Sequence, residues 1–344
     1  MTAVAPADSL AGTDRWADWD RFVESVRDTT FMQSSWWAEF RTLAGYSHFG
    51  AVLRSGGEIV GGALVQRFSY TDSGCFYYIP AGPILPHDET LASDVFKAVL
   101  EAIEDQRQAE TQVVSHLRIE PLWPVLPSFV TGFQPRPVLG DPFMEPRDTL
   151  WIDLRATDDA ILAQMKPKGR YNVRVAVRHG VTVVEDNSER GLADFQAIYG
   201  DTAERQNFGA KPADYFEELT GMLSSLGRGS LFFAEYNGVR VATALVVGFG
   251  QVATYFYGGS LPAFRHVMAP YLLHFEIMRR SREQGREWYD LWGIAPANVS
   301  PHPFEGITEF KGKFGGREIR FVPTLDYVFD PAAYGDYLAT AKHW

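Results

Sequence analysis

The chain has 344 residues, of which 46% are hydrophobic and 22% charged, a composition that excludes disorder over most of its length. At roughly 150 residues per domain, this length predicts about two domains. The 32 Lys and Arg residues against 43 Asp and Glu residues give a net charge of −11, which argues against nucleic-acid binding over the whole surface and leaves room for a local basic groove. Cys75 is the one cysteine, so an intramolecular disulfide and a multi-cysteine zinc site are both excluded.

Residues 1–14 are expected to form a flexible N-terminal tail. They lack the positive and apolar regions of a signal peptide. No run in the chain approaches the 18 consecutive apolar residues typical of a transmembrane helix. A single thiol also fits a reducing compartment. We therefore expect a cytoplasmic protein without a transmembrane segment.

Hydrophobic periodicity predicts a first domain of alternating helices and strands over residues 15–150. In chain order the predicted elements are a helix from Trp16, a helix capped by Ser34 or Ser35, strands at 51–53, 59–65 and 76–79, a helix at 91–106 and a strand at 115–119.

The second expected domain, residues 151–328, has a similar order of elements, and residues 329–344 are expected to be a C-terminal tail. Its predicted elements are a strand at 151–154, a short helix at 160–165, helices at 193–205 and 215–226, strands at 231–236, 240–247 and 254–257, a helix at 269–284 and a strand at 288–291.

An internal repeat links the two halves. Residues 57–65 align without gaps with residues 238–246, and both segments continue into a third strand, a helix and a further strand. A glycine hairpin followed by this order resembles the acyltransferase unit of the GNAT superfamily. The expected fold class is therefore α+β, with two tandem GNAT-like acyltransferase domains that arose by internal duplication.

Motifs of several large enzyme classes are missing from the sequence. It has no P-loop, no HExxH, no GxSxG and no dinucleotide fingerprint. Its eight histidines show no metal-ligand spacing, so we expect no metal site.

Residues 166–178 carry five basic residues and no acid. Arg170, Arg174 and Arg178 would share one face of a helix, with Val173 and Val177 among the apolar residues on the other face. A solvated basic face and a phosphate-contacting face both fit this pattern, because arginine forks match phosphate oxygens.

The segment 306–316 is the densest candidate for chemistry. Lys311 and Lys313 lie between Phe310 and Phe314, and apolar walls around an ammonium strengthen its electrostatic effect by excluding water. The alternative is a basic strand edge. An extended segment would point the two lysines to opposite faces.

A strand over 254–257 would place Tyr255 and Tyr257 on one face and Phe256 on the other. Arg205 would lie at the end of a helix, where a cation complements the helix dipole.

Several short motifs occur together in one order along the chain, and as a set they closely resemble the FemABX family of non-ribosomal, tRNA-dependent peptidyltransferases. The resemblance covers about residues 30–328. The motifs are FMQSSWWAEF (31–40), YIPAGPI (78–84), EPRDT-x-x-IDL (145–154), KxKGRYNVRxA (166–176), ERxxF (204–208), YFYGGS (255–260), YDLWGI (289–294) and FKxKFGG (310–316).

The resemblance implies aminoacyl transfer from aminoacyl-tRNA to an amine of a peptidoglycan precursor stem peptide, in its UDP-MurNAc-pentapeptide or lipid-linked form. The donor tRNA would be a substrate, with no cofactor, and a lipid-linked acceptor would require peripheral membrane contact. The chemistry is aminolysis of an ester, so the nucleophile is the substrate amine and the enzyme aligns the reactants and holds the oxyanion. The stretch between Phe208 and Leu231 leaves no room for the long helical hairpin of some relatives, which indicates the short, armless, FemX-like branch.

By the same resemblance, Lys311 matches the lysine that stabilises the developing oxyanion, with Phe310 beside it as a catalytic candidate. Arg205 matches an arginine that binds the phosphates of the precursor, and Tyr255 and Tyr257 would line a groove between the domains. The other candidate substrate-binding residues are Arg170, Asn172, Arg174, Tyr78 and Lys313. Family members often carry an acid soon after the Gly-Pro of the N-terminal motif, whereas the nearest acid in this chain is Asp88.

Three alternatives stay open. The acceptor could be a secondary metabolite. The chain could be an acyl-CoA N-acyltransferase, although its turn at 265–271 has no glycine to hold a pyrophosphate and Pro270 has no N–H to donate. It could also be a non-catalytic binder of a nucleotide-sugar or of tRNA, against which the intact Lys311 argues.

Overall fold

The computed structural model describes residues 8–9, 13–27, 29–137, 146–297 and 300–341. The chain divides into two compact units. Unit 1 comprises Met1–Arg147 and Arg320–Trp344, and unit 2 comprises Asp148–Ile319. Two units agree with the number of domains predicted from chain length. The second boundary differs from the expected one, because the chain returns to unit 1 at residue 320 rather than ending its second domain at 328.

Unit 1 is a mixed sheet with helices on both faces, and its strand order is β1-β2-β3-β4-β5-β14-β6. The strands β2 to β4 are antiparallel neighbours, β4 and β5 are parallel, and β14 is antiparallel to β5. Its elements are β1 (Asp8–Ser9), α1 (Thr13–Ser25), η1 (Phe31–Gln33), α2 (Ser35–Thr42), β2 (Tyr46–Ser55), β3 (Glu58–Ser69), β4 (Gly74–Pro80), α3 (Glu89–Gln108), β5 (Val113–Glu120), β6 (Gln134–Pro135), β14 (Leu325–Val328) and α10 (Pro331–Ala341).

Local sequence signals explain where the unit 1 helices begin. The Ser34 side chain accepts a hydrogen bond from the backbone N–H of Trp37 and caps α2, while Asp88 caps α3 by accepting from Leu91 at 2.8 Å. Helix α3 buries Val95, Val99 and Ile103 against the sheet, as its periodicity predicts. The opposite face of the sheet carries an aromatic cluster, made of Tyr46, Phe76, Tyr78 and the α10 residues Tyr334 and Tyr337.

The expected C-terminal tail at 329–344 is wrong for the described part of that segment. Strand β14 and helix α10 pack on unit 1, where the Asp326 carboxylate accepts two 2.8 Å hydrogen bonds from the Arg118 guanidinium of β5. Both side chains are 0% exposed. Tyr334 donates to Asp326 at 2.7 Å, and Arg118 also donates to the Tyr337 hydroxyl at 2.8 Å. This buried network holds the returning segment in place.

The expected N-terminal tail is also shorter than residues 1–14. Asp8–Ser9 pairs with Val52 and Ala51 of β2, and α1 begins at Thr13. Residues 1–7 and 10–12 lie outside the described residues, as does Glu145 at the start of the 145–154 motif.

Unit 2 is a second mixed sheet, with the strand order β13-β7-β12-β11-β10-β9-β8. Its elements are β7 (Asp148–Asp153), α4 (Asp158–Gln164), α5 (Pro167–Arg178), β8 (Thr182–Glu185), α6 (Glu189–Gln206), α7 (Ala213–Ser225), β9 (Gly229–Tyr236), β10 (Val239–Phe249), β11 (Val252–Ser260), η2 (Pro262–Val267), α8 (Ala269–Glu283), β12 (Trp288–Gly293), α9 (Glu305–Lys311), η3 (Gly312–Phe314) and β13 (Arg317–Arg320).

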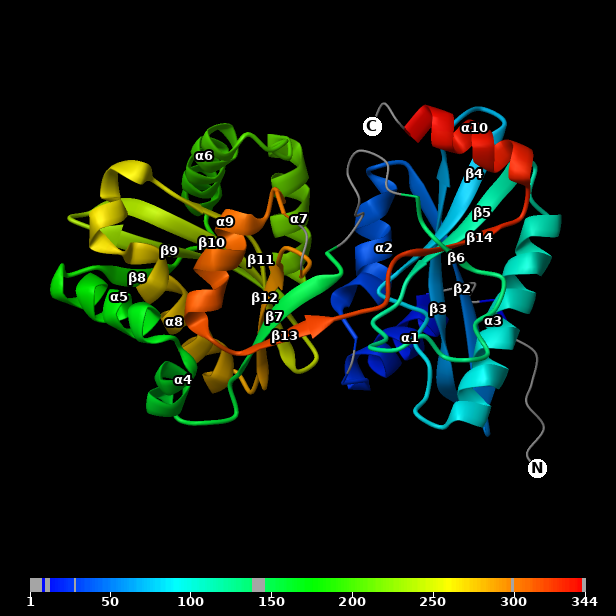
Figure 1. Ribbon diagram of the computed structural model, residues 1–344, viewed down its shortest axis with the longest axis horizontal. Helices are drawn as coiled ribbons and strands as arrows, with labels where there is room; N and C mark the ends of the chain where they lie inside the picture. The colour runs from blue at the N-terminus through cyan, green and yellow to red at the C-terminus, as the bar shows by residue number, and fades with distance from the viewer. Residues whose placement is uncertain (1–7, 10–12, 28, 138–145, 298–299, 342–344) are drawn as a thin grey trace. The chain divides into compact units, whose positions relative to one another are not determined.

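The two units share one topology, which can be followed by label in Figure 1. In unit 1 the order β2-β3-β4-α3-β5 matches β9-β10-β11-α8-β12 in unit 2, with antiparallel pairs followed by one parallel pair. Each parallel pair is extended by an antiparallel strand, β14 in unit 1 and β7 in unit 2. The internal repeat predicted from residues 57–65 and 238–246 is therefore confirmed as β3 and β10.

The units differ where their parallel strands end. In unit 1, β4 and β5 stay paired as far as Pro80 and Glu120. In unit 2, the register of β11 and β12 pairs only Val252–Thr254 with Trp288–Asp290, although β11 continues to Ser260. The strands of unit 2 therefore separate after Thr254.

A β-bulge follows this point in β11. Val246 of β10 pairs with Tyr255, and the next β10 residue, Leu245, pairs with Tyr257, so Phe256 is the extra residue. An extra residue breaks the alternation of side chains along a strand. The prediction that Tyr255 and Tyr257 share one face is therefore wrong.

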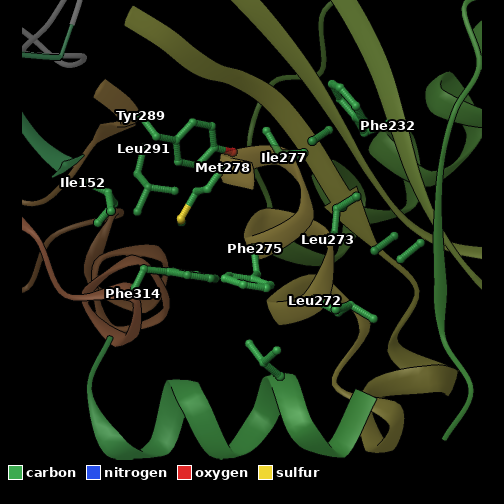
Figure 2. Packing of buried hydrophobic residues seen from close by; sticks show 14 of the residues in the cluster. Ile152, Phe232, Leu272, Leu273, Phe275, Ile277, Met278, Tyr289, Leu291 and Phe314 are labelled. Atoms are coloured by element: carbon green, nitrogen blue, oxygen red, sulfur yellow. The ribbon is translucent and has the colours of Figure 1, made fainter. Parts of the chain in front are cut away.

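The core of unit 2 lies between the sheet and helices α5 and α8. Figure 2 shows Leu272, Leu273 and Phe275 of α8 in this core, with Phe314 projecting into it from the segment after α9. Among the residues that the structure describes, none of the helices combines the length and hydropathy needed to cross a bilayer.

Candidate active site

Lys311 is the last residue of α9 and is followed by the 3-10 turn η3. The segment is therefore helical, and the alternative of a basic strand edge is wrong. Phe310 and Phe314, four residues apart, lie on the same side of this helical segment with their ring centroids 5.2 Å apart. A Cβ on Gly315 would collide with the carbonyl oxygen of Gln164, so this glycine, with φ +77°, lets the turn pack closely against the end of α4.

The Lys311 side chain is buried at the point where β11 and β12 separate. It is 5% exposed, and its ammonium donates a 2.6 Å hydrogen bond to the carbonyl oxygen of Gly293 at the end of β12. The Nζ atom also lies 5.9 Å from the ring centroid of Tyr255, the first residue of β11 beyond the parallel pairing. Both β11 and β12 therefore contribute to the surroundings of this ammonium.

Burial and one counter-charge set the ionisation of Lys311. Burial lowers the pKa of Lys311 to about 7, while the negative charge of Asp290 opposes that shift. Burial raises the pKa of Asp290 to about 6, against the hydrogen bonds from Thr149 and Trp292 and the charge of Lys311. A lysine and a carboxylate with pKa values this close to neutrality are typical of functional sites.

The other ionisable groups around Lys311 are held neutral. His274 of α8 forms a 2.8 Å hydrogen bond through Nδ1 with the Tyr289 hydroxyl, and its ring meets the Tyr255 ring at 4.5 Å. Burial lowers the pKa of His274 to about 3, and burial raises the pKa of Tyr255 and of Tyr289 above the usual value. Near pH 7 the charge of this cluster therefore depends on Lys311 and Asp290.

Phe310, the second catalytic candidate, lies beside this cluster. Its ring is 5.3 Å from the Tyr271 ring and 5.6 Å from the His274 ring, both of α8. The structure therefore brings Phe310, Lys311 and Tyr255 together.

Lys313 lies apart from the Lys311 cluster. Its ammonium pairs with the Glu309 carboxylate at 2.6 Å on the surface of α9. Its backbone carbonyl accepts a 3.0 Å hydrogen bond from the Lys166 N–H, and Gly169 of α5 packs closely on the same carbonyl. The start of the basic helix α5 is thus docked on the turn that follows Lys311.

Helix α5 forms as predicted, but its side chains divide differently from the expectation. Arg170 folds back and donates to the carbonyl oxygens of Ala163, at 3.3 Å, and Met165. Arg174 is exposed, whereas Asn172 is buried. Val177 was expected on the apolar face and is 58% exposed instead, because the helix buries the side that carries Val173 and Ala176.

Arg205 and Tyr257 belong to a different part of unit 2. Arg205 lies in the last turn of α6 and pairs with Asp201 at 2.7 Å. The Tyr257 hydroxyl is 3.0 Å from the Tyr215 hydroxyl of α7. The bulge turns Tyr257 toward the aromatic rings of α6 and α7, while Tyr255 packs with the α8 cluster. Tyr255 and Tyr257 therefore lie in different parts of unit 2 and contact different helices.

Tyr78 belongs to unit 1. It is buried on β4, and its hydroxyl donates to the Glu120 carboxylate at the end of β5. The roles of Tyr78, Arg205 and Asn172 in substrate binding stay predictions.

Residues around Lys311 that sequence reasoning did not single out are Asp290, Gly293, His274, Tyr289 and Thr149. The YDLWGI motif contained a usable signal, because an aspartate inside an otherwise apolar strand indicates a buried carboxylate that needs partners. Within the described ranges, no group of three His, Cys, Asp or Glu side chains is placed to hold a metal ion.

A model of the FemAB family matches residues 16–127, 131–225 and 228–342. The chain belongs to the FemAB family. The resemblance identified from its short motifs is therefore confirmed.

Two curated members of the family are similar to the chain. A Lipid II:glycine glycyltransferase of Staphylococcus saprophyticus subsp. saprophyticus is 22% identical over 388 residues, covering 92% of each chain. A UDP-N-acetylmuramoylpentapeptide-lysine N(6)-alanyltransferase of Weissella viridescens is 26% identical over 196 residues, covering 56% of each chain. The names of both relatives describe enzymes that transfer an amino acid.

The crystal structure of FemX matches this structure with a TM-score of 0.86 at 20% identity, covering 96% of this chain and 100% of that chain. This similarity, together with the topology shared by the two units, confirms the expected α+β fold with two tandem domains.

Proposed function

We propose that this FemAB protein transfers an aminoacyl group from aminoacyl-tRNA to an amine of a peptidoglycan precursor stem peptide, as UDP-MurNAc-pentapeptide or in lipid-linked form. The names of the two relatives support an amino acid as the transferred group and a precursor as the acceptor. The proposal includes a cytoplasmic site of action and no cofactor. A lipid-linked acceptor would bring the protein to the membrane surface.

The observation that carries the proposal is the buried ammonium of Lys311. In the reaction, the acceptor amine attacks the ester carbonyl, its oxygen gains negative charge, and the tetrahedral intermediate then expels the ribose hydroxyl of the tRNA. An ammonium held away from water stabilises that oxyanion far more than it would in solvent. Lys311 supplies this charge, and Phe310 shields it on the α8 side.

The chain needs no nucleophile of its own for this reaction. Cys75 is buried in unit 1, and burial raises the pKa of its thiol to about 11. Such a thiol does not supply a thiolate near neutral pH. The substrate amine is therefore the nucleophile, and the protein acts by alignment and by charge stabilisation.

The proposal assigns the remaining candidates to substrate binding. Arg205 would bind the phosphates of the precursor, with help from Arg170 and Arg174 on the 166–178 helix, and Lys313 would contact the donor RNA. Tyr255 borders the Lys311 ammonium and would contact the reacting ester. Tyr257, Asn172 and Tyr78 complete the proposed binding residues.

The test incubates the protein with a pool of labelled aminoacyl-tRNAs and precursor acceptors, and detects aminoacylated acceptor by mass spectrometry. Lys311→Met keeps the apolar stem and removes the charge, so transfer should fall by about 10²–10³ while the protein stays folded. Lys97→Met, at an exposed lysine of α3 that pairs with Glu101, is the matched control and should retain activity. Wild-type activity in Lys311→Met, or no transfer by the wild type with any donor, would contradict the proposal.

A further inference from the structure

Asp290 is a buried carboxylate at the position where β12 leaves β11. It is 2% exposed and is the last β12 residue in the parallel pairing. Its Oδ1 atom accepts a hydrogen bond from the hydroxyl of Thr149 on β7 and a 2.7 Å hydrogen bond from the backbone N–H of Trp292. An ionised carboxylate is a strong acceptor for such bonds.

The hydrogen bond to Trp292 lies inside a bulge of β12. Asp290 pairs with Trp151 and Gly293 pairs with Thr149, so β12 has one residue more than β7 over this stretch. Trp292 has φ +62°, a conformation that costs energy for a bulky side chain and persists only when its surroundings enforce it. The Asp290 carboxylate accepts hydrogen bonds from Trp292 on β12 and from Thr149 on β7. These two hydrogen bonds hold the bulge in place.

The bulge determines where the next carbonyl points. Gly293 directly follows Trp292, and its carbonyl oxygen accepts the 2.6 Å hydrogen bond from Lys311. An ammonium has three hydrogens to donate. Among the described residues, the Gly293 carbonyl is the acceptor that the structure shows for Lys311. A lysine bound to a carbonyl rather than to a carboxylate keeps its full positive charge available for a developing oxyanion.

We propose that Asp290 is a positioning residue for the transfer reaction, which fastens the β12 bulge so that Gly293 orients the Lys311 ammonium and which keeps that ammonium protonated by its negative charge. This inference rests on the proposed function. Asp290 acts through Gly293 and Lys311 and does not itself contact the reacting atoms.

The charges facing Lys311 support the second part of this role. His274 from α8 is neutral near pH 7 because burial lowers its pKa, and Tyr255 from β11 and Tyr289 from β12 are neutral because burial raises theirs. Among the described residues, the charge of Asp290 is the one that raises the pKa of Lys311 against burial. Loss of that charge should therefore lower the pKa of Lys311 further.

The experiment separates geometry from charge with two variants. Asp290→Asn keeps an oxygen that can accept the hydrogen bonds of Trp292 and Thr149 but removes the charge, whereas Asp290→Ala removes both. Asp153→Asn is the matched control, because Asp153 lies on the neighbouring strand β7 and pairs with Arg155 at the surface. Each protein is studied by NMR titration with lysine labelled at Cε, the Lys311 signal being assigned by its loss in Lys311→Met.

In Asp290→Asn the titration of Lys311 should move to lower pH by about one unit, while Asp153→Asn leaves it unchanged. In single-turnover transfer with saturating substrates, the alkaline decline of the rate should move by the same amount. Asp290→Ala should lose on the order of 10²-fold in kcat with little change in the KM for the acceptor, and Asp290→Asn should recover most of that loss below the new pKa.

A Lys311 titration that is the same in wild type and Asp290→Asn would overturn the charge role. Equal kcat in Asp290→Ala and wild type would overturn the positioning role. If Asp290→Ala does not fold, Asp290→Asn still decides the charge role through the NMR titration, which needs no substrate. Thr149→Val, which removes one hydrogen bond to Asp290 and keeps its charge, then decides the positioning role, and a kcat equal to that of the wild type would overturn it. Absence of transfer by the wild type would count against the proposed function, whereas the titration reports on Asp290 and Lys311 in either case.

Discussion

Lys311 combines two properties that oppose each other. Burial gives its charge strength because water is excluded, and the same burial lowers its pKa to about 7, so the charge is partly lost at neutral pH. Asp290 offsets part of that loss from within the same cluster. The charge that we propose for catalysis therefore changes in the range around neutral pH.

We expect the rate of the chemical step to fall as the pH rises through about 7, because the ammonium of Lys311 is neutralised there. Lys311→Arg should be slower than wild type and should not show this decline, since a guanidinium stays protonated. Single-turnover transfer measured between about pH 6 and 8.5 tests this expectation. The ratio of the two rates removes the titration of the acceptor amine, which both proteins share.

A wild-type rate that rises relative to Lys311→Arg as the pH passes 7 would contradict this expectation. It would indicate that the neutral amine of Lys311 acts as a general base instead of its ammonium acting on the oxyanion.

At the scale of single elements, two bulges decide which side chains meet. The bulge at Phe256 separates Tyr255 from Tyr257, and the bulge before Gly293 aims its carbonyl at Lys311. Strand periodicity alone could not predict either bulge. A bulge interrupts the alternation of side chains along the strand, and neither a glycine nor a proline marks the position of the bulge at Phe256.

The segment that carries Lys311 illustrates a second limit of sequence reasoning. Phe310 and Phe314 lie on one side whether the segment is helical or extended, since their spacing of four fits both periods. The proposed role of Lys311 follows from its neighbours and from the family motif, but its helical conformation could not be predicted from them. Its partner Asp290 lies 21 positions earlier, so only the tertiary fold reveals the pair.

The start of α8 leads to a prediction about the donor. The pyrophosphate of an acyl-CoA donor could be held by backbone N–H groups at a helix start. Here Met268 adopts φ +56° before α8 and Pro270 lies in its first turn, where it has no N–H to donate. We expect no saturable binding of acetyl-CoA by calorimetry, with charged tRNA as the positive control. Binding in the low micromolar range would contradict this prediction.

At the scale of the whole molecule, the two units differ in how far their parallel strands stay paired. Unit 1 keeps β4 and β5 paired to their ends, while unit 2 opens the equivalent strands and places Lys311 there. The repeat of residues 57–65 and 238–246 was visible in the sequence because glycine hairpins leave a local pattern. The return of residues 320–344 was not visible, because its main contact joins Arg118 and Asp326 across 208 positions.

That contact should contribute strongly to the stability of unit 1. Asp326→Ala leaves the Arg118 guanidinium buried without its carboxylate, and breaking a buried ion pair in this way typically costs about 3–5 kcal/mol. Urea unfolding should show this loss, whereas Asp336→Ala, at an exposed position of α10, should change the free energy of unfolding by less than about 0.5 kcal/mol. Equal unfolding curves for wild type and Asp326→Ala would show that the network contributes little.

The path of the chain also has a consequence for its synthesis on the ribosome. Strand β5 is made early, but β14, which covers its edge, is made about 200 residues later, after all of unit 2. During that interval the β5 edge is unpaired and Arg118 has no carboxylate, while unit 2 already has every strand of its own sheet. The sequence of unit 2 is therefore complete before that of unit 1, and in the meantime the β5 edge is open to pairing with other strands.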